Sequence, residues 1–215
     1  VHWELELSDM DSSMSEMLRM QKEEANIGFA KYIRSQYLEW MSPQQTAKTA
    51  STTSADTSAS TDRPPMSPDI FKKKVFPLLD KGERVFLIVI DNFRYDQWRM
   101  LAKETGDLFE IDEDMYMSIL PTATQYARNA IFSGLMPLQI AQMFPDLWVD
   151  EDEDEGKNLN EAPLIQTQIE RYRRKHTFSY HKINDSAGAE KLMQQFRQLK
   201  QNELNVVVFN FIDML

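Results

Sequence analysis

The stretch Val85-Phe86-Leu87-Ile88-Val89-Ile90-Asp91 decides the fold, because six apolar residues lie between the charged segment 81–84 and an aspartate. Such a run is typical of a strand that is buried on both faces of a parallel sheet. Asp91 then lies at the carboxyl end of that strand. Ligands of open α/β sheets bind in the crevice beyond the carboxyl ends, so this acid is placed where a metal or a polar substrate would bind.

A second stretch, Leu120-Pro121-Thr122-Ala123-Thr124-Gln125, predicts a hydroxyl at the start of a helix. After Thr124, apolar residues recur at helical spacing as far as a stop at Gly134. The helix dipole and the free N–H groups of a first turn favour a phosphate there, and also the alkoxide of a nucleophile. A divalent metal shared with Asp91 would activate the Thr124 hydroxyl. Thr122 remains the alternative nucleophile, although it precedes the helix.

The same residue types also have ordinary structural roles. Threonine is a frequent helix cap and aspartate often ends a strand, so Asp91 and Thr124 could each be structural. A third apolar run, 205–212, ends in Asp213, to which the same alternative applies.

The chain divides into three parts by composition. Residues 1–42 predict a helical segment, with a capping-box pattern at Ser13–Glu16 and a stripe of Met and aromatic residues at helical spacing. Residues 43–66 are rich in Ser and Thr and predict a flexible linker. Residues 67–215 predict an α/β domain. Burial of the stripe against a second copy is one hypothesis for the helical segment.

Within the α/β domain, predicted strands alternate with predicted helices, which implies a largely parallel sheet flanked by helices. The acidic run 150–155 predicts a solvated loop, with loose cation binding as the alternative. The expected helices are 96–103, 124–133, 137–143, 162–175 and 189–201, and the expected strands are 85–90, 108–112, 115–120, 178–183 and 206–212.

Composition excludes several classes of protein. The 215 residues are 42% hydrophobic, which suffices for a sizeable core. The absence of Cys rules out disulfides and thiolate metal sites and fits a cytoplasmic location. No apolar run reaches membrane-spanning length, so no membrane partner is expected. The net charge of −10 argues against non-specific duplex binding, and for the three His residues surface or capping roles are expected.

Two motifs resemble those of PglZ domains, a branch of the alkaline phosphatase superfamily. The segment 89–96, Val-Ile-Asp-Asn-Phe-Arg-Tyr-Asp, is similar to the first motif, and Pro121-Thr122-Ala123-Thr124 is similar to the second. The resemblance implies an alkaline-phosphatase-like sheet and two zinc ions, with manganese as the other metal considered. Asp91 and Thr124 would hold one zinc. Asp213 would hold the other, together with a His that we expect four residues later, beyond Leu215.

A helical segment, a linker and a PglZ domain that opens with Lys74-Val75-Phe76-Pro77-Leu78-Leu79 resemble the PorX-type response regulators. This resemblance implies control of type IX secretion and a sensor kinase that acts through a receiver domain. It also implies a homodimer and a regulatory partner such as a sigma factor. The implied substrate is a phosphodiester, either an oligonucleotide or a cyclic nucleotide.

Three further residues are candidate substrate contacts. Arg128 lies four residues after Thr124 on the same helix face, Arg94 follows Asp91 by three residues, and Asn92 could donate a hydrogen bond. Structural ion pairs are the alternative for both arginines. The predicted reaction is phosphodiester hydrolysis through a Thr124 nucleophile, and we expect residues 1–215 alone to bind metal weakly and to be inactive.

Two rival functions remain from the sequence. The main rival is a regulatory module of the same fold that works through protein contacts without catalysis. The other is an Asp91 phosphoacceptor of the receiver or haloacid-dehalogenase kind. It fits less well, because Phe93 stands where such a phosphatase has a second Asp.

Overall fold

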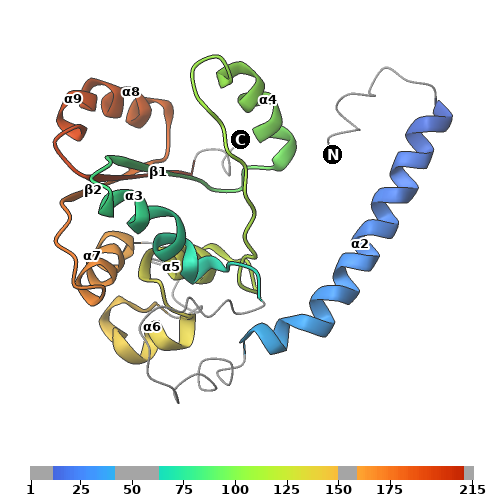
Figure 1. The fold of residues 1–215 in the computed structure, drawn as a ribbon, viewed down its shortest axis with the longest axis horizontal. Coiled ribbons are helices and arrows are strands. Elements are labelled where there is room, and N and C mark those ends of the chain that lie inside the picture. The colour runs from blue at the N-terminus through green and yellow to red at the C-terminus, as the bar shows by residue number, and fades with distance from the viewer. Residues whose placement is uncertain (1–11, 42–62, 150–158, 211–215) are drawn as a thin grey trace. The chain divides into compact units, whose positions relative to one another are not determined.

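The computed structural model describes residues 12–41, 63–149 and 159–210, which form two compact units. The first unit contains helices α2 (Ser12–Met41) and α4 (Tyr95–Thr105). The second unit contains all other described helices and strands (Figure 1). The predicted division at residues 42/43 and 66/67 is not tested by these units, since most of the linker lies outside the described residues.

Helix α2 is a single long helix, as its periodicity predicts. Arg19 pairs with Glu16 at 2.6 Å and with Glu23 at 3.2 Å, spacings that stabilise a solvent-facing helix. The rings of Tyr32 and Trp40 meet edge to face with centroids 5.7 Å apart. Its exposed large apolar residues are Met17, Met20, Ile27, Phe29, Tyr32 and Leu38.

The second unit is built on a three-stranded sheet with the order β1-β3-β2, in which both pairings are parallel. The strands are β1 (Val85–Ile90), β2 (Phe178–Ile183) and β3 (Leu204–Phe209). Central β3 is buried along most of its length, whereas β1 and β2 are partly exposed. The predicted parallel α/β architecture is confirmed.

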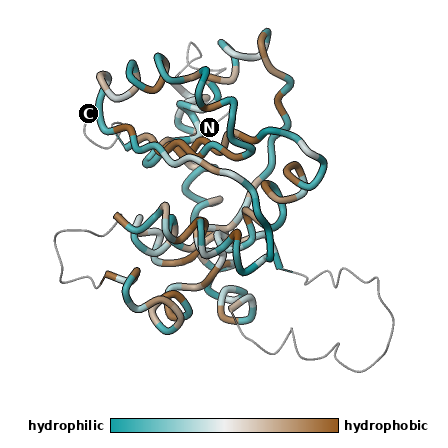
Figure 2. Tube along the Cα trace, turned by 90° about the vertical axis from the view of Figure 1, so that its left-hand side faces the viewer, coloured by the Kyte–Doolittle hydropathy of each residue, from teal (hydrophilic) through white to brown (hydrophobic). Residues whose placement is uncertain are grey.

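One face of the sheet is closed by helices α3 (Phe76–Asp80), α5 (Thr124–Ser133) and α7 (Glu161–Arg171), which lie together on one side of it in Figure 1. We call it the closed face. Side chains alternate along a strand, so every second residue of each strand points into this core. Figure 2 shows the resulting concentration of hydrophobic residues in the strands. The strand residues of this core are Val85, Leu87, Val89, Phe178, Tyr180, Leu204, Val206 and Val208.

The opposite face, which we call the open face, carries the intervening residues and is covered by α8 (Ser186–Gln194) and α9 (Phe196–Leu199). The rings of Phe86 and Phe196 stack at 5.7 Å. Coverage is incomplete in the described part of the chain, because Phe86 is 37% exposed and Ile88 is 54% exposed.

The segment that enters the second unit consists of short consecutive helical turns. Residues Ser67–Asp69 form a 3₁₀ turn, Phe71–Val75 a π-helical turn, and α3 follows without a break. The Ser67 hydroxyl accepts a hydrogen bond from the backbone N–H of Ile119 at 3.2 Å. This bond ties the entry segment to the chain just before α5.

Two predicted strands, 108–112 and 115–120, are wrong. These residues are irregular, apart from a single bridge between Met66 and Met117. Their short apolar stretches resemble strands, yet Leu108 is 76% exposed and Met115 is 87% exposed, so no sheet of the described residues buries these side chains. In place of the predicted helix 189–201, the structure has two helices, α8 and α9, the first of which begins at Ser186. Helix α6 (Pro137–Met143) has the predicted bounds. A 3₁₀ turn, Pro145–Leu147, follows α6.

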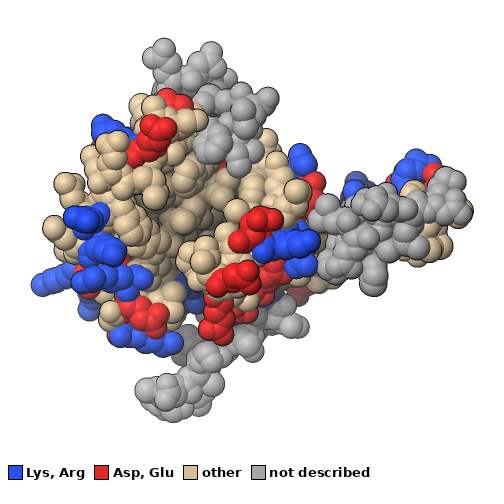
Figure 3. Space-filling view, turned by 90° about the horizontal axis from the view of Figure 1, so that it is seen from above, with Lys and Arg blue, Asp and Glu red and all other residues tan. Residues whose placement is uncertain are grey.

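Charge is unevenly distributed over the surface. In the face seen in Figure 3, Lys and Arg side chains lie next to Asp and Glu side chains in several mixed groups, with uncharged surface between the groups. None of the described helices is both long and apolar enough to cross a membrane.

Candidate active site at the carboxyl end of the sheet

Three polar residues continue the apolar rows of the closed face at the carboxyl ends of the strands. Asp91 follows β1, Asn210 follows β3, and Lys182 lies near the end of β2. The ladder extends over these positions, since the Asp91 N–H donates to the Phe209 carbonyl at 2.9 Å and the Asn210 N–H to the Ile183 carbonyl at 2.9 Å. Parallel pairing therefore brings three polar side chains to one edge.

Thr124 is the first residue of α5, as predicted from the sequence. Its hydroxyl donates a hydrogen bond to Asp91 Oδ2 at 3.3 Å. Thr124 is half-buried and lies at the positive end of the helix dipole, whereas Thr122 is exposed in the chain before the helix. Of the two candidate nucleophiles, Thr124 is therefore the one in contact with the strand-end aspartate.

The far end of α5 is held by Gly134, the predicted stop. Its φ of 63° is left-handed, which glycine adopts without steric cost. A Cβ at this position would collide with the side-chain amide of Gln168 on α7. This close approach lets α5 and α7 pack tightly behind the site.

Arg128 lies one turn after Thr124, and its side chain is only 4% exposed. Its Nη1 donates to Asp91 Oδ2 at 3.0 Å and to Asn210 Oδ1 at 2.8 Å. Its Nε donates to Glu161 Oε1, and its Nη2 is buried with no hydrogen-bond partner among the described residues. Arg128 thus joins α5 to the ends of two strands and to α7.

Glu161, the first residue of α7, is fully buried. One carboxylate oxygen accepts from Arg128 and the other from the hydroxyl of Tyr180 on β2. Burial, together with the neighbouring carboxylate of Glu161, raises the pKa of Tyr180, so this phenol keeps its proton and acts as a donor. A continuous polar chain therefore runs from Tyr180 through Glu161 and Arg128 to Asp91 and Thr124.

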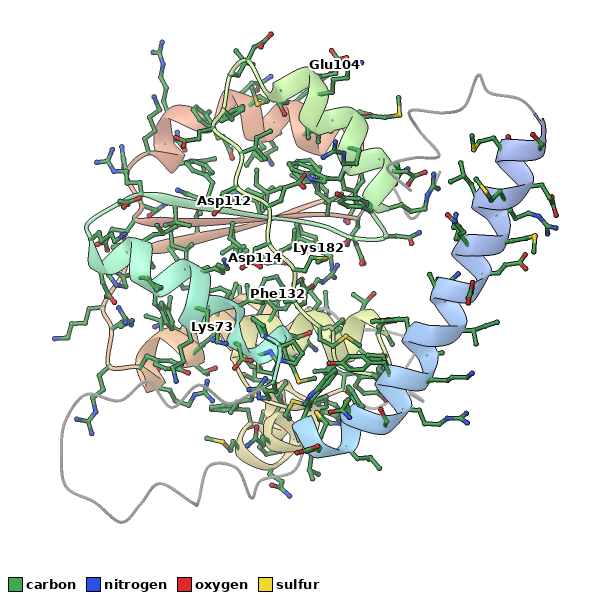
Figure 4. All side chains as sticks on the ribbon, turned by 45° about the vertical axis from the view of Figure 1, so that its right-hand side comes forward. Lys73, Glu104, Asp112, Asp114, Phe132 and Lys182 are labelled. Carbon is green, nitrogen blue, oxygen red and sulfur yellow. The ribbon has the colours of Figure 1, made fainter. Side chains whose placement is uncertain are left out.

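Lys182 contributes a second cation to this region. Burial lowers its pKa, and the nearby carboxylates of Glu161 and Asp91 oppose that effect. Figure 4 shows Lys182 and Phe132 on the side of the sheet that faces α5. The positive charge of Lys182 therefore interacts with the carboxylate of Asp91.

For the remaining predicted site residues, the structure shows no contact with Thr124 among the described residues, or they lie outside those residues. Asn92 is exposed in the turn after β1, with a left-handed φ of 55° that asparagine tolerates. Arg94 belongs to the first unit, where it pairs with Asp96 at 2.9 Å. Asp213 lies outside the described residues, as do the acidic run 150–155 and His2.

The residues that meet here fit part of a cation site. Asp91 Oδ2 and Thr124 Oγ1 are two oxygens close enough to bind the same ion, and Asp91 remains 27% exposed. No group of three His, Cys, Asp or Glu side chains that could hold a metal is found among residues 12–41, 63–149 and 159–210. Further ligands would have to come from other parts of the protein.

The sequence reading missed Glu161, Tyr180, Lys182 and Asn210. A signal for Glu161 did exist, because it shares a helix face with Leu164, Ile165 and Gln168, all buried. A charged residue on an apolar face needs a buried partner. Nothing in the sequence indicated that this partner would be Arg128.

The fold and the site define an alkaline-phosphatase-like α/β domain. Residues 70–215 match the family model of the PglZ alkaline phosphatase-like domain of the BREX system. The chain therefore belongs to the PglZ family. Residues 1–41 match the model of the PorX response regulator linker domain, which agrees with the architecture that the sequence predicts. No curated protein matches the chain in sequence.

Proposed function

We propose that this chain belongs to the effector of a response regulator and that the effector hydrolyses phosphodiesters with Thr124 as nucleophile. The observation that carries the proposal is the hydrogen bond from Thr124 Oγ1 to Asp91 Oδ2 at the start of α5. The PglZ match over residues 70–215 supports a phosphatase-like hydrolase. The PorX linker match supports two-component signalling with a sensor kinase.

Asp91 and Thr124 would hold a zinc ion, and Asp213 a second one. When bound, a divalent cation would lower the pKa of the Thr124 hydroxyl and favour its alkoxide. Carboxylate and hydroxyl oxygens are suitable donors for such an ion. The same donors suit manganese.

In the proposed reaction, Thr124 Oγ1 forms a bond to phosphorus while the bond from phosphorus to the leaving oxygen breaks. The first-turn N–H groups of α5 stabilise the negative charge on the phosphoryl oxygens. Arg128 would contact one such oxygen through Nη2, the guanidinium nitrogen for which the described part of the chain offers no hydrogen-bond partner. Water then cleaves the phosphothreonine and restores the hydroxyl. Arg94 and Asn92 remain proposed substrate contacts.

We further propose an oligonucleotide or a cyclic nucleotide as substrate and control of type IX secretion as the biological output. A homodimer and a regulatory partner such as a sigma factor belong to the same proposal. These parts of the proposal rest on the resemblance of the sequence to PorX-type response regulators, whereas the linker match itself supports only two-component signalling.

The test is zinc-dependent hydrolysis of a chromogenic phosphodiester by the full-length protein. We expect Thr124→Ala to reduce kcat/KM by about a thousandfold or more, since it removes the nucleophile. Thr122→Ala is the matched control, because it removes a hydroxyl two residues away, and it should retain turnover. Loss of turnover in Thr122→Ala alone would move the nucleophile to Thr122.

A regulatory module without catalysis is the second candidate function. One observation favours it: Arg128 Nη1 already lies 3.0 Å from the Asp91 oxygen that contacts Thr124, and so it competes with a metal for that oxygen. The same assay separates the two functions. Equal turnover in wild type and Thr124→Ala, or no turnover in either, would favour the regulatory module.

A further inference from the structure

A positive charge lies directly beside the proposed metal ligand. Arg128 Nη1 is 3.0 Å from Asp91 Oδ2, and the guanidinium is almost completely buried. Arginine stays protonated in proteins, so this charge cannot be relieved by loss of a proton. Unless it is balanced, it would repel a divalent cation and would occupy the carboxylate that should bind that cation.

Glu161 is the buried group that can balance this charge. Its side chain is 0% exposed, and Arg128 Nε donates to its Oε1. Tyr180 donates to Oε2, so both oxygens of the carboxylate are engaged by donors. A buried carboxylate is costly unless it is paired and fully hydrogen-bonded, and both conditions hold here.

We propose that Glu161 is the counter-charge of Arg128 and, in this way, a positioning residue for the metal site. Because Glu161 neutralises the guanidinium, Asp91 keeps its negative charge for a cation. Tyr180 holds the Glu161 carboxylate in the orientation that makes this contact. This proposal rests on the proposed function, since it assumes that Asp91 binds the catalytic metal.

A purely structural role would also explain why three elements meet here. Arg128, Glu161 and Tyr180 come from α5, α7 and β2, and an ion pair between them would hold these elements together. The two roles differ in the property that a substitution would change. A structural tie affects the stability of the fold, whereas a counter-charge affects the affinity of Asp91 for a cation in protein that remains folded.

The experiment measures zinc affinity of the full-length protein by competition with a chromogenic chelator, well below the melting temperature of each variant. We expect Glu161→Gln to weaken zinc binding about tenfold or more, in the range found for residues that orient metal ligands. Tyr180→Phe should weaken it less, in the same direction, because Glu161 keeps its charge. Tyr180→Phe also provides a result if Glu161→Gln does not fold.

Two variants serve as matched controls. Glu170→Gln removes an exposed carboxylate from the same helix, and Ser179→Ala removes a hydrogen-bonded hydroxyl from the same strand on the open face. Both should bind zinc as wild type does. A loss in these controls equal to that in Glu161→Gln and Tyr180→Phe would overturn the proposal.

The double variant Arg128→Met with Glu161→Gln gives the sharpest result. It removes both charges, so the repulsion of the cation is gone and no counter-charge is needed. We expect it to recover most of the zinc affinity that Glu161→Gln alone loses. Failure to recover, or wild-type affinity in Glu161→Gln, would overturn the proposal.

The proposed function and the counter-charge are tested by different measurements. Turnover in Thr124→Ala tests the nucleophile, and zinc affinity in the Glu161 variants tests the counter-charge. If Thr124→Ala loses turnover while Glu161→Gln binds zinc normally, then the counter-charge is wrong and the nucleophile stands. If Thr124→Ala keeps wild-type turnover, the proposed function fails whatever the zinc affinities are.

Discussion

The two faces of the sheet in the second unit differ in how completely they are covered. On the closed face, Val206 and Val208 of β3 are fully buried against helices. On the open face, Phe86 and Ile88 of β1 keep more than a third of their surface exposed.

The residues of the candidate site belong to the closed face. Asp91 and Asn210 extend its rows, and Arg128 and Glu161 come from the helices that cover it. A tightly packed environment restricts side chains to few rotamers, so the candidate site lies where its groups can be held most accurately.

The first prediction compares one substitution on both faces. Phe132 is fully buried against the closed face, with its ring edge-to-face on Tyr180 at 6.3 Å. We expect Phe132→Ala to lower the free energy of unfolding by about 3–5 kcal/mol, because it leaves a cavity. Phe86→Ala on the open face should cost only about 1–2 kcal/mol, since part of that ring is already exposed. Equilibrium denaturation measures both, and equal losses would mean that the two faces are equally well packed.

The second prediction concerns the contact between the two helices of the closed face. Gly134→Ala combines a left-handed φ with a collision against Gln168, so we expect a loss of about 2 kcal/mol or more in unfolding free energy. Gly82→Ala is the matched control, since Gly82 also has a positive φ, 78°, but has open space around it. It should cost only the backbone strain, about 1 kcal/mol. A larger loss at Gly82 would contradict the tight packing of α5 on α7.

The third and smallest effect is a pH dependence that arises on the open face. Burial lowers the pKa of His181, whose Nε2 is enclosed and has no hydrogen-bond partner within residues 12–41, 63–149 and 159–210. The unfolded chain therefore takes up this proton at higher pH than the folded chain does. Stability should fall as the pH drops through about 6.5, the ordinary histidine value. Denaturation at several pH values measures the slope, and His181→Gln should flatten it; an unchanged slope would show that another group titrates.

Much of the fold was predictable because its signals are local. The three strands, the helix that starts at Thr124 and the helix 137–143 follow from runs and periodicities within a few residues of each other. The wrong strands at 108–112 and 115–120 are also short segments rich in apolar residues. They have no partner strand among the described residues, and pairing is not a local property.

The candidate site shows the same division between local sequence signals and tertiary contacts. Sequence alone was enough to select Asp91 and Thr124, because one ends a strand and the other begins a helix, and both positions are defined by neighbours along the chain. Tertiary structure alone decided that Arg128 would meet Asn210 across 82 residues and Glu161 across 33. The physical reason is that a buried charge needs a partner, and only the packing of α5, α7 and the sheet determines which partner is near.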